Sequence, residues 1–262
     1  MILDDLTAAV AKRLVTDKQQ VPPEVMKQRA LAAPKKEGFP FERNLKKPGL
    51  SFICEVKKAS PSKGLIASDF PYVAIAKEYE QAGAAAISVL TERDYFLGSP
   101  QYLQEIAAAV DTPVLRKDFI IDEYQIYEAR ALGASAVLLI CAVLDDDRLR
   151  TFFQLADSLG LSALVEAHDE DEVRRAIAIG ARVIGVNNRN LKDFTISLDT
   201  SCRLRPLVLK DILFVAESGI KTADHTKVLR DHGVDAVLIG ETFMRSPDKK
   251  AMLDELAGGY RG

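Results

Sequence analysis

The strongest constraint on the fold is the alternation of short apolar strands with amphipathic helices from residue 50 onward. Side chains alternate with period 2 in a strand, and apolar residues recur every three or four positions in a helix. Strand-like runs occupy residues 52–57, 85–90, 113–117, 136–140, 163–166, 183–187, 213–217 and 236–239. Helical patterns occupy residues 72–81, 101–110, 123–131, 146–158, 170–179, 198–204, 222–231 and 249–256. Eight strands alternating with helices predict a closed (β/α)8 TIM barrel of parallel strands.

An open doubly wound sheet is the alternative fold for this alternation. That fold normally carries a Gly-x-Gly-x-x-Gly turn after its first strand, and no such turn follows here. The length of 262 residues also suits one barrel domain, because such barrels commonly run to about 200–250 residues. We therefore predict a single barrel domain over residues 1–262.

Residues 1–48 differ from the alternating part of the chain. Apolar residues recur at helical spacing up to position 14, and a second short helix is predicted from residue 23 or 24 to residue 31. The proline-centred segments at 39–41 and 47–49 are predicted to interrupt regular structure. Because this part is too short for a core of its own, we predict a helical extension packed on the barrel.

The composition excludes several classes of protein. Hydrophobic residues make up 48% and charged residues 28% of the chain, as in ordinary globular proteins. The formal net charge of −3 provides no basic excess for nucleic acid. No apolar run reaches the ~18 residues that a membrane helix needs, and the N-terminus lacks the basic start of a signal peptide. We expect neither nucleic acid nor a membrane as partner.

Cysteine and histidine usage bears on location and metal binding. The three cysteines lie far apart, which is typical of reduced thiols in a cytoplasmic protein. Three histidines and the lack of a Cys-x-x-Cys pair give little support to a metal site. The sequence carries no direct indication of oligomeric state, and our expectation is a monomer or weak homodimer.

Charged side chains gather where the predicted strands end. In a parallel barrel these ends meet at one mouth, where the active sites of such barrels lie. Period-2 alternation directs the relevant side chains inward. The inward set comprises Glu55, Lys57, Lys117, Glu166, Asn187 and Glu217. Because burying such charges is costly unless they are paired or used, we predict a catalytic site; a ring of ion pairs at the barrel rim is the alternative.

Two glycine turns predict a phosphate site. Ser218-Gly219 and Gly240-Glu241 follow the last two strands, where many barrels bind phosphate through backbone N–H groups. Lys57 and Ser60 would complete this site, since the first strand neighbours the last in a closed barrel. The Glu241 carboxylate would have to turn away from the phosphate.

Other conspicuous residues receive structural interpretations. Arg116 faces outward and is predicted to extend between helices to solvent. His168 is expected to cap or line the loop after Glu166. Cys141 ends a strand without an evident basic partner, so we predict a small core residue and not a nucleophile.

With these strand ends identified, the chain closely resembles the indole-3-glycerol phosphate synthase family. Six motifs in the family's order carry the resemblance, at residues 55–62, 115–120, 164–168, 184–191, 215–220 and 238–241. The first reads Glu-Val-Lys-Lys-Ala-Ser-Pro-Ser, and the helical extension is also a family feature. The resemblance implies ring closure, decarboxylation and dehydration of 1-(2-carboxyphenylamino)-1-deoxyribulose 5-phosphate in tryptophan biosynthesis. It implies no metal and no cofactor.

The resemblance also implies roles for the inward residues. Lys117 matches the general acid of ring closure, and Glu166 matches a catalytic carboxylate. Lys57 matches a lysine that handles anionic groups and can assist dehydration, while Glu55 would orient both lysines. Phosphate binding is implied for Lys57, Ser60, Ser218, Gly219, Gly240 and Glu241. Substrate binding is implied for Asn187, Arg189, Glu217 and Ser218.

Two questions stay open at this stage. The first is which lysine acts in which step. The second is whether the two lysines lower each other's pKa or the carboxylates raise the pKa of both. The aromatic ring of the substrate also needs an apolar wall. Candidates in or near the loops after the second, third and fourth strands are Phe96, Leu97, Phe119 and Leu138.

Three other functions are compatible with such a barrel. A sugar-phosphate isomerase would usually carry an aspartate–cysteine pair where this chain has lysines. A Schiff-base aldolase would use a lysine as nucleophile, which borohydride would trap. A non-catalytic phosphate-binding barrel would keep the glycine turns but would not need Lys117 and Glu166.

Overall fold

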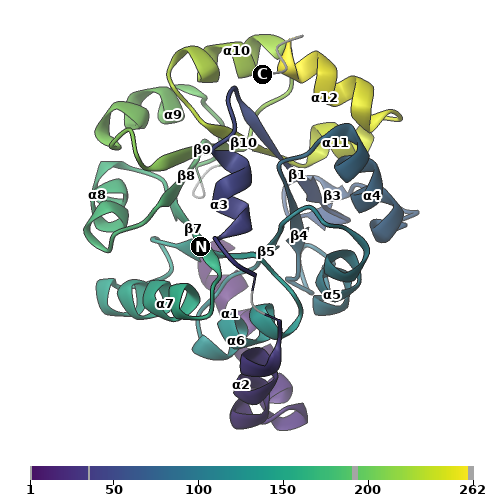
Figure 1. Cartoon of the computed structure of the whole chain (residues 1–262), viewed down its shortest axis with the longest axis vertical. Helices are drawn as coiled ribbons and strands as arrows, with labels where there is room; N and C mark the ends of the chain where they lie inside the picture. The colour runs from purple at the N-terminus through teal and green to yellow at the C-terminus, as the bar shows by residue number, and fades with distance from the viewer. Residues whose placement is uncertain (1, 35, 191–193, 259–262) are drawn as a thin grey trace.

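Eight parallel strands close into a barrel with helices around its outside (Figure 1). The computed structural model describes residues 2–34, 36–190 and 194–258. In order around the barrel, the strands are β1 (Ser51–Val56), β10 (Ala236–Ile239), β9 (Leu213–Glu217), β8 (Val183–Asn187), β7 (Ser162–Ala167), β6 (Ala136–Ile140), β5 (Val114–Lys117) and β4 (Ala86–Leu90). Strand β4 pairs with β1 and closes the ring. The predicted barrel is confirmed, and the open sheet is excluded.

Eight helices lie within a residue or two of the predicted ranges, whereas a short helix at Glu241–Arg245 and a 3-10 turn at Arg205–Leu207 were not among those ranges. The helices that follow the barrel strands are α4 (Tyr72–Ala82), α5 (Pro100–Ala109), α6 (Glu123–Ala131), α7 (Asp146–Ser158), α8 (Glu170–Ala178), α9 (Asp199–Leu204), the 3-10 turn η1 (Arg205–Leu207), α10 (Ala223–Asp231), α11 (Glu241–Arg245) and α12 (Lys249–Ala257). Side chains of Asp145, Asp169 and Thr222 cap α7, α8 and α10 by accepting backbone N–H groups of their first turns. These caps explain why the starts were predictable.

Alternation along the strands produces two separate apolar layers. Ile53, Leu115 and Leu164 point into the barrel and pack with other inward side chains. Phe52 and Cys54 point outward and pack in the layer between strands and helices. Burial of both layers supplies the main driving force for folding. The inward polar side chains at the strand ends interrupt this pattern, and they mark the site.

A helix closes the N-terminal end of the barrel where the sequence predicted irregular structure. The segment at 39–41 does not break the chain, because α3 (Pro40–Leu45) begins there. Pro40 takes the first helical position, where its missing N–H group needs no partner. Phe41 and Leu45, one helical turn apart, are buried in the inward apolar layer. The prediction was wrong because this burial favours a short helix over an interruption.

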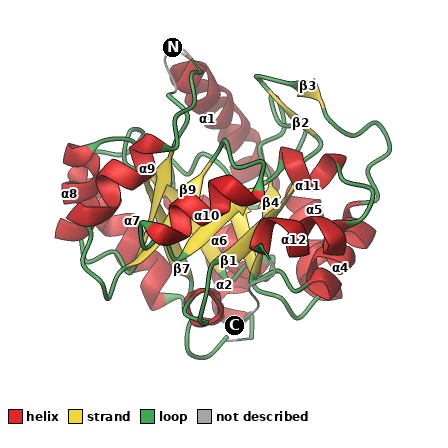
Figure 2. Cartoon of the chain, turned by 90° about the horizontal axis from the view of Figure 1, so that it is seen from above, coloured by secondary structure: helices red, strands yellow, loops and turns green. Residues whose placement is uncertain are grey.

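The first two helices form the predicted N-terminal extension. They are α1 (Ile2–Gln20) and α2 (Pro23–Ala32). Figure 2 shows α1 at the same end of the barrel as the hairpin of β2 (Ala59–Ser60) and β3 (Gly64–Leu65), which lies in the loop after β1. Val10 and Leu14 of α1 pack with Tyr124 of α6. No helix among the described residues has both the length and the apolar character needed to cross a membrane.

Arg116 departs from its predicted environment. It faces outward from β5 but is only 1% exposed. Its Nη2 lies 3.1 Å from Oδ2 of Asp118, and its Nη1 lies 2.7 Å from Oε2 of Glu128. The prediction of a side chain reaching solvent was wrong, because two carboxylates within reach compensate the desolvation of the guanidinium.

Candidate active site

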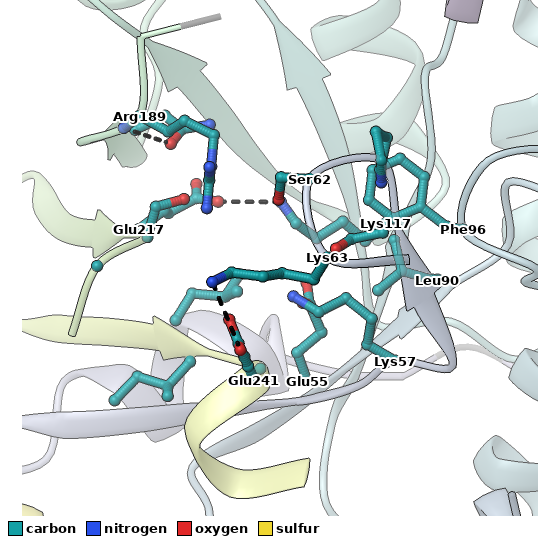
Figure 3. Close-up of a pocket in the computed structure, with 18 of the residues that line it drawn as sticks. Glu55, Lys57, Ser62, Lys63, Leu90, Phe96, Lys117, Arg189, Glu217 and Glu241 are labelled. Atoms are coloured by element: carbon teal, nitrogen blue, oxygen red, sulfur yellow. Dashed lines mark hydrogen bonds and ion pairs between the residues drawn. The ribbon is translucent and has the colours of Figure 1, made fainter. Parts of the chain in front are cut away.

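The C-terminal ends of the strands surround a cavity of about 480 Å³ (Figure 3). All the predicted catalytic and phosphate-binding residues, and the substrate-binding residues implied by the resemblance, line this cavity. They are Glu55, Lys57, Ser60, Lys117, Phe119, Glu166, Asn187, Arg189, Glu217, Ser218, Gly219, Gly240 and Glu241. Leu191, the last residue of the 184–191 motif, lies outside the described residues. The fold thus brings the predicted set together, and the role of each member stays a prediction.

Lys117, at the end of β5, lies among carboxylates. Its Nζ is 3.1 Å from Oε2 of Glu217 and 3.7 Å from Oε2 of Glu166. Burial alone would lower the pKa of Lys117, but the charges of Glu217, Glu166 and Glu55 outweigh burial and raise the pKa above its ordinary value. The carboxylates therefore favour the protonated form of this lysine at neutral pH.

Glu166, at the end of β7, lies between Lys117 and a histidine. Its Oε1 is 3.3 Å from Nε2 of His168 and 3.4 Å from Nδ2 of Asn187. Burial would raise the pKa of Glu166, but His168 and Lys117 lower it to about 2. Glu166 is therefore an ionised carboxylate that can accept a proton. The sequence analysis did not foresee the His168 contact, although His168 follows Glu166 by two residues and so falls on the same side.

Glu217, at the end of β9, is the least satisfied of the three glutamates. Its Oε1 is buried and has no hydrogen-bond partner among the described residues. Burial, together with the charges of Glu166 and Glu55, raises the pKa of Glu217 to about 7 even though Lys117 opposes the shift. An added Cβ at Gly185 on β8 would collide with this same Oε1. The glycine therefore makes room for a carboxylate that is free to bind a donor in the cavity.

Glu55 and Lys57 form a tight pair where β1 ends. Lys57 Nζ lies 2.6 Å from Oε1 of Glu55, and both side chains are largely buried. A Cβ at Gly240 would meet both Glu55 Oε1 and Lys57 Nζ. Gly240 thus allows the loop after β10 to approach the ion pair closely.

The glycine turns and Ser60 of the β2–β3 hairpin line the same cavity. Ser218 and Gly219 both adopt left-handed backbone conformations, with φ of 67° and 84°. The Glu241 carboxylate bonds Nε of Arg245 at 3.0 Å and lies 3.9 Å from Nζ of Lys63. Figure 3 shows Lys63 reaching toward Glu241. The sequence analysis missed Lys63, because a lysine in a loop gives no sign of its direction.

An apolar wall lines another part of the cavity. The rings of Phe96 and Phe119 lie 6.2 Å apart at an angle of 40°, and Leu138 lines the same cavity. Leu97 was wrongly included among the candidates, because it is absent from the lining and its side chain is 41% exposed. Its neighbour Phe96 occupies the inward position instead.

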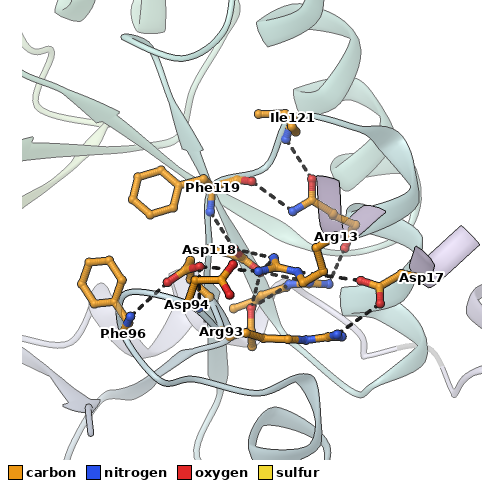
Figure 4. A network of polar contacts seen from close by, with 12 residues as sticks. Arg13, Asp17, Arg93, Asp94, Phe96, Asp118, Phe119 and Ile121 are labelled. Atoms are coloured by element: carbon orange, nitrogen blue, oxygen red, sulfur yellow. Dashed lines mark hydrogen bonds and ion pairs between the residues drawn. The ribbon is translucent and has the colours of Figure 1, made fainter. Parts of the chain in front are cut away.

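Helix α1 contributes to the cavity and is tied to the strand ends (Figure 4). Leu3 and Leu6 line the cavity, which the sequence did not indicate. Arg13 Nη2 lies 3.4 Å from Oδ1 of Asp118, next to Lys117 in sequence. Arg93, after β4, lies 3.2 Å from Oδ1 of Asp17 on α1. These contacts hold the extension over the mouth.

The family model and the most similar relatives of this chain agree on one family. A family model described as indole-3-glycerol phosphate synthase matches residues 3–256. The chain is 56% identical over 258 residues to the indole-3-glycerol phosphate synthase of Ruminiclostridium cellulolyticum, covering 98% of this chain and 99% of that protein. It is 56% identical over 256 residues to the synthase of Endomicrobium trichonymphae, with coverage of 98% and 99%.

Solved structures share the barrel at much lower identity. The thiamine phosphate pyrophosphorylase of Pyrococcus furiosus aligns with a TM-score of 0.61 and 17% identity, covering 83% of this chain and 96% of that chain. A 3-hexulose-6-phosphate synthase aligns with a TM-score of 0.62 and 16% identity, covering 81% and 100%. At such identity the similarity concerns the fold alone.

Proposed function

Because the chain belongs to the indole-3-glycerol phosphate synthase family, we propose that Lys117, Glu166 and Lys57 are its reacting groups. As a member of this family it is a decarboxylating carbon–carbon lyase of tryptophan biosynthesis. Its substrate is 1-(2-carboxyphenylamino)-1-deoxyribulose 5-phosphate, and its product is indole-3-glycerol phosphate. The observation that carries our assignment is the position of Lys117 Nζ, 3.1 Å from Glu217 and 3.7 Å from Glu166 beside the cavity.

In ring closure, the aromatic carbon that bears the carboxylate attacks the ketone carbon of the sugar chain. The ketone oxygen becomes an alkoxide, and we assign Lys117 as the group that protonates it. The raised pKa of Lys117 does not prevent this transfer, because an alkoxide is a far stronger base than an amine. Loss of CO₂ then restores the aromatic ring without another protein group.

In dehydration, the hydroxyl at the new ring carbon leaves as water while the neighbouring carbon loses a proton. The ionised Glu166 is our candidate base, because it faces Lys117 and remains a carboxylate at neutral pH. Lys57 is our candidate acid for the departing hydroxyl, held by Glu55 at 2.6 Å. The loss of the hydroxyl and the loss of the proton thus both take place between groups that line one cavity.

The remaining lining residues suit the ends of the substrate. Ser60, Ser218 and the backbone around Gly219 and Gly240 would hold the phosphate. The unpartnered Oε1 of Glu217 would accept a sugar hydroxyl. Asn187 and Arg189 would bind the anionic or hydroxyl groups between them, and the Phe96–Phe119 wall would receive the aromatic ring.

The activity is tested by mixing the purified chain with substrate and following indole fluorescence, with EDTA present. We expect indole to appear at the same rate with and without the chelator. Loss of activity in EDTA that a divalent cation restores would contradict the metal-free proposal. The aldolase alternative is disfavoured, because a Schiff base needs an unprotonated lysine and Lys117 is held protonated; borohydride with substrate should leave activity intact.

The two lysines are distinguished by measuring CO₂ release and indole formation together. Lys117→Ala should abolish both, because ring closure precedes CO₂ loss. Lys57→Ala should release CO₂ while indole formation lags. Equal loss of both signals in Lys57→Ala would instead place Lys57 before decarboxylation.

Three broader predictions accompany this proposal. We propose one domain over residues 1–262, with the extension of residues 1–48 packed on the barrel. We also propose a monomer or weak homodimer located in the cytoplasm. Sedimentation over a range of protein concentrations tests the oligomeric state, since a stable tetramer would contradict it.

A further inference from the structure

We infer that His168 is a positioning residue for Glu166, an imidazolium held by Glu172 that keeps the Glu166 carboxylate ionised and oriented. This inference rests on the proposed role of Glu166 as the base. His168 is placed directly after β7, and Glu172 is in the first turn of α8. The three side chains form a line from the substrate cavity outward, carboxylate to imidazole to carboxylate.

The geometry fixes both the ring and its protons. Nδ1 of His168 lies 3.0 Å from Oε2 of Glu172, and the backbone N–H of His168 donates to the same oxygen at 2.7 Å. A carboxylate only accepts hydrogen bonds, so Nδ1 carries a proton. Nε2 lies 3.3 Å from Oε1 of Glu166. A lone pair at that nitrogen would face a negative charge, so the second proton is favoured as well.

The contact between His168 and Glu166 is chiefly electrostatic. Nε2 is buried and makes no hydrogen bond of good geometry among the described residues, so the 3.3 Å approach acts as an ion pair. Burial would lower the pKa of His168, but Glu166 and Glu172 together raise it to about 10. The imidazolium charge then complements Lys117 on the other side of Glu166.

His168 faces a second cavity, which shares Leu3, Asn187 and Arg189 with the substrate cavity. Glu166 lines the substrate cavity, whereas His168 and Glu172 line the second cavity of about 560 Å³. The ring therefore covers the back of the Glu166 carboxylate. With Oε1 occupied by His168 and Asn187, the other oxygen, Oε2, is left toward Lys117 and the substrate.

The surroundings contain other titratable or charged groups. They are Asp169, Arg189 and Arg203 at the second cavity, Arg175 and Cys141 beside Glu172, and Asp146 beside Arg175. Arg203 pairs with Glu170, and Arg175 pairs with Asp146. Burial raises the pKa of Cys141 to about 12, so its thiol stays neutral. The charge of His168 is thus set mainly by Glu166 and Glu172.

The decisive experiment is the pH dependence of kcat in His168→Gln. Glutamine can keep a neutral donor toward Glu166, while it removes the charge and the Nδ1–H bond to Glu172. We expect kcat to fall about 10-fold, because the Glu166 carboxylate loses the contact that orients it and with it part of the contribution of a general base. The acidic limb of the profile should move up by about one pH unit or more as the pKa of Glu166 rises. KM should change little, because His168 does not line the substrate cavity.

Two further variants separate positioning from structure. Glu172→Gln keeps an oxygen that can accept the backbone N–H of His168, so the loop is preserved. The substitution removes the negative charge beside the ring, so His168 should lose its proton at a lower pH. The activity of this variant should therefore fall on the alkaline side at a lower pH than that of the wild type. Asp171→Asn removes a charge from the same helical turn, where the side chain is 87% exposed, and should match the wild type.

An unchanged acidic limb in His168→Gln would overturn the inference, even if kcat falls, because a structural role alone would not move that limb. So would an NMR titration in which His168 loses its proton near the free-imidazole value of about 6.5; with only three histidines in the chain, assignment is direct. Glu166→Gln is measured in parallel. If it keeps full activity, the proposed base fails, and that failure is distinct from a failure of the His168 inference.

Discussion

At the scale of single residues, the site is defined by Lys117 and three carboxylates, of which Glu55 also pairs with Lys57. Lys117 lies near both Glu166 and Glu217 and lowers the pKa of each. The two pKa values diverge all the same, because His168 helps to lower that of Glu166 to about 2, whereas burial raises that of Glu217 to about 7. Two carboxyl groups with separated pKa values in one cavity are typical of distinct roles, one as base and one as binding group.

Removing Lys117 should abolish catalysis without unfolding the chain. We expect Lys117→Ala to lower kcat by about 1,000-fold or more, in the range that a positioned general acid contributes. The measurement is indole formation, with the circular dichroism spectrum as the test of folding. Lys77→Ala on the exposed surface of α4 is the matched control and should retain full activity. Substantial turnover in folded Lys117→Ala would refute the assignment.

Glu217 should make stability depend on pH in an unusual direction. Burial raises its folded pKa from 4.5 to about 7, so between those values the folded state holds more protons than the unfolded chain. Stability from this group therefore falls as pH rises through that window. The Tm of Glu217→Gln, relative to wild type, should rise from pH 5 to pH 8. Parallel Tm curves for the two proteins would contradict the raised pKa.

At the scale of elements, the strands set distances that side chains alone could not. Strand β8 passes so close to Glu217 that a Cβ at position 185 would meet its Oε1, which would have to shift. We expect Gly185→Ala to lower both Tm and kcat, because the added methyl group meets Glu217 Oε1 and also lies 3.1 Å from Leu164 Cδ1.

A double-mutant cycle tests this explanation. Glu217→Ala vacates the space that the methyl group needs, so the two substitutions together should cost less stability than the sum of their separate effects. Additive losses in the Gly185→Ala, Glu217→Ala cycle would mean that the glycine matters for another reason. Thermal unfolding at one pH is sufficient for the measurement.

Helix α1 should influence substrate binding through its anchor. Arg13 joins the helix to Asp118, which follows Lys117, while Leu3 and Leu6 line the cavity. We expect Arg13→Ala to raise KM several-fold and lower Tm slightly, because the helix loses a partly buried ion pair. Lys12→Ala, an exposed cation on the same helix, is the control. Equal KM values for both variants would show that the anchoring of α1 by Arg13 does not affect substrate binding.

At the scale of the whole molecule, sequence periodicity predicted the barrel and the residues at its mouth. Strand ends such as Lys117 and Glu166 were predictable because parity and topology place them at one mouth. Contacts that depend on the conformation of a loop were not predictable. Examples are the contact of His168 with Glu166 and that of Lys63 with Glu241. Helix α3 was missed because its stability comes from burial of Phe41 and Leu45 against distant strands. Local pattern carries no information about such partners.

The stability of the whole chain should peak in mildly acidic solution. Glu166 has a folded pKa lowered from 4.5 to about 2, so its contribution is present above 4.5 and lost as pH falls. His168 has a folded pKa raised from 6.5 to about 10, so its contribution is present below 6.5 and lost as pH rises. Glu217 also favours the lower pH, as argued above.

Together the three groups place the maximum of Tm near the ordinary pKa of a carboxyl group, because Glu217 loses stability above 4.5 and His168 above 6.5. Catalysis requires Glu166 ionised and Lys117 protonated, which holds from there to neutral pH. We expect Tm to decline from there toward alkaline pH, and the decline to be shallower in the His168→Gln, Glu217→Gln double variant. Scanning calorimetry across the range measures both curves. An equally steep decline in the double variant would show that groups outside the barrel mouth control the stability of the molecule.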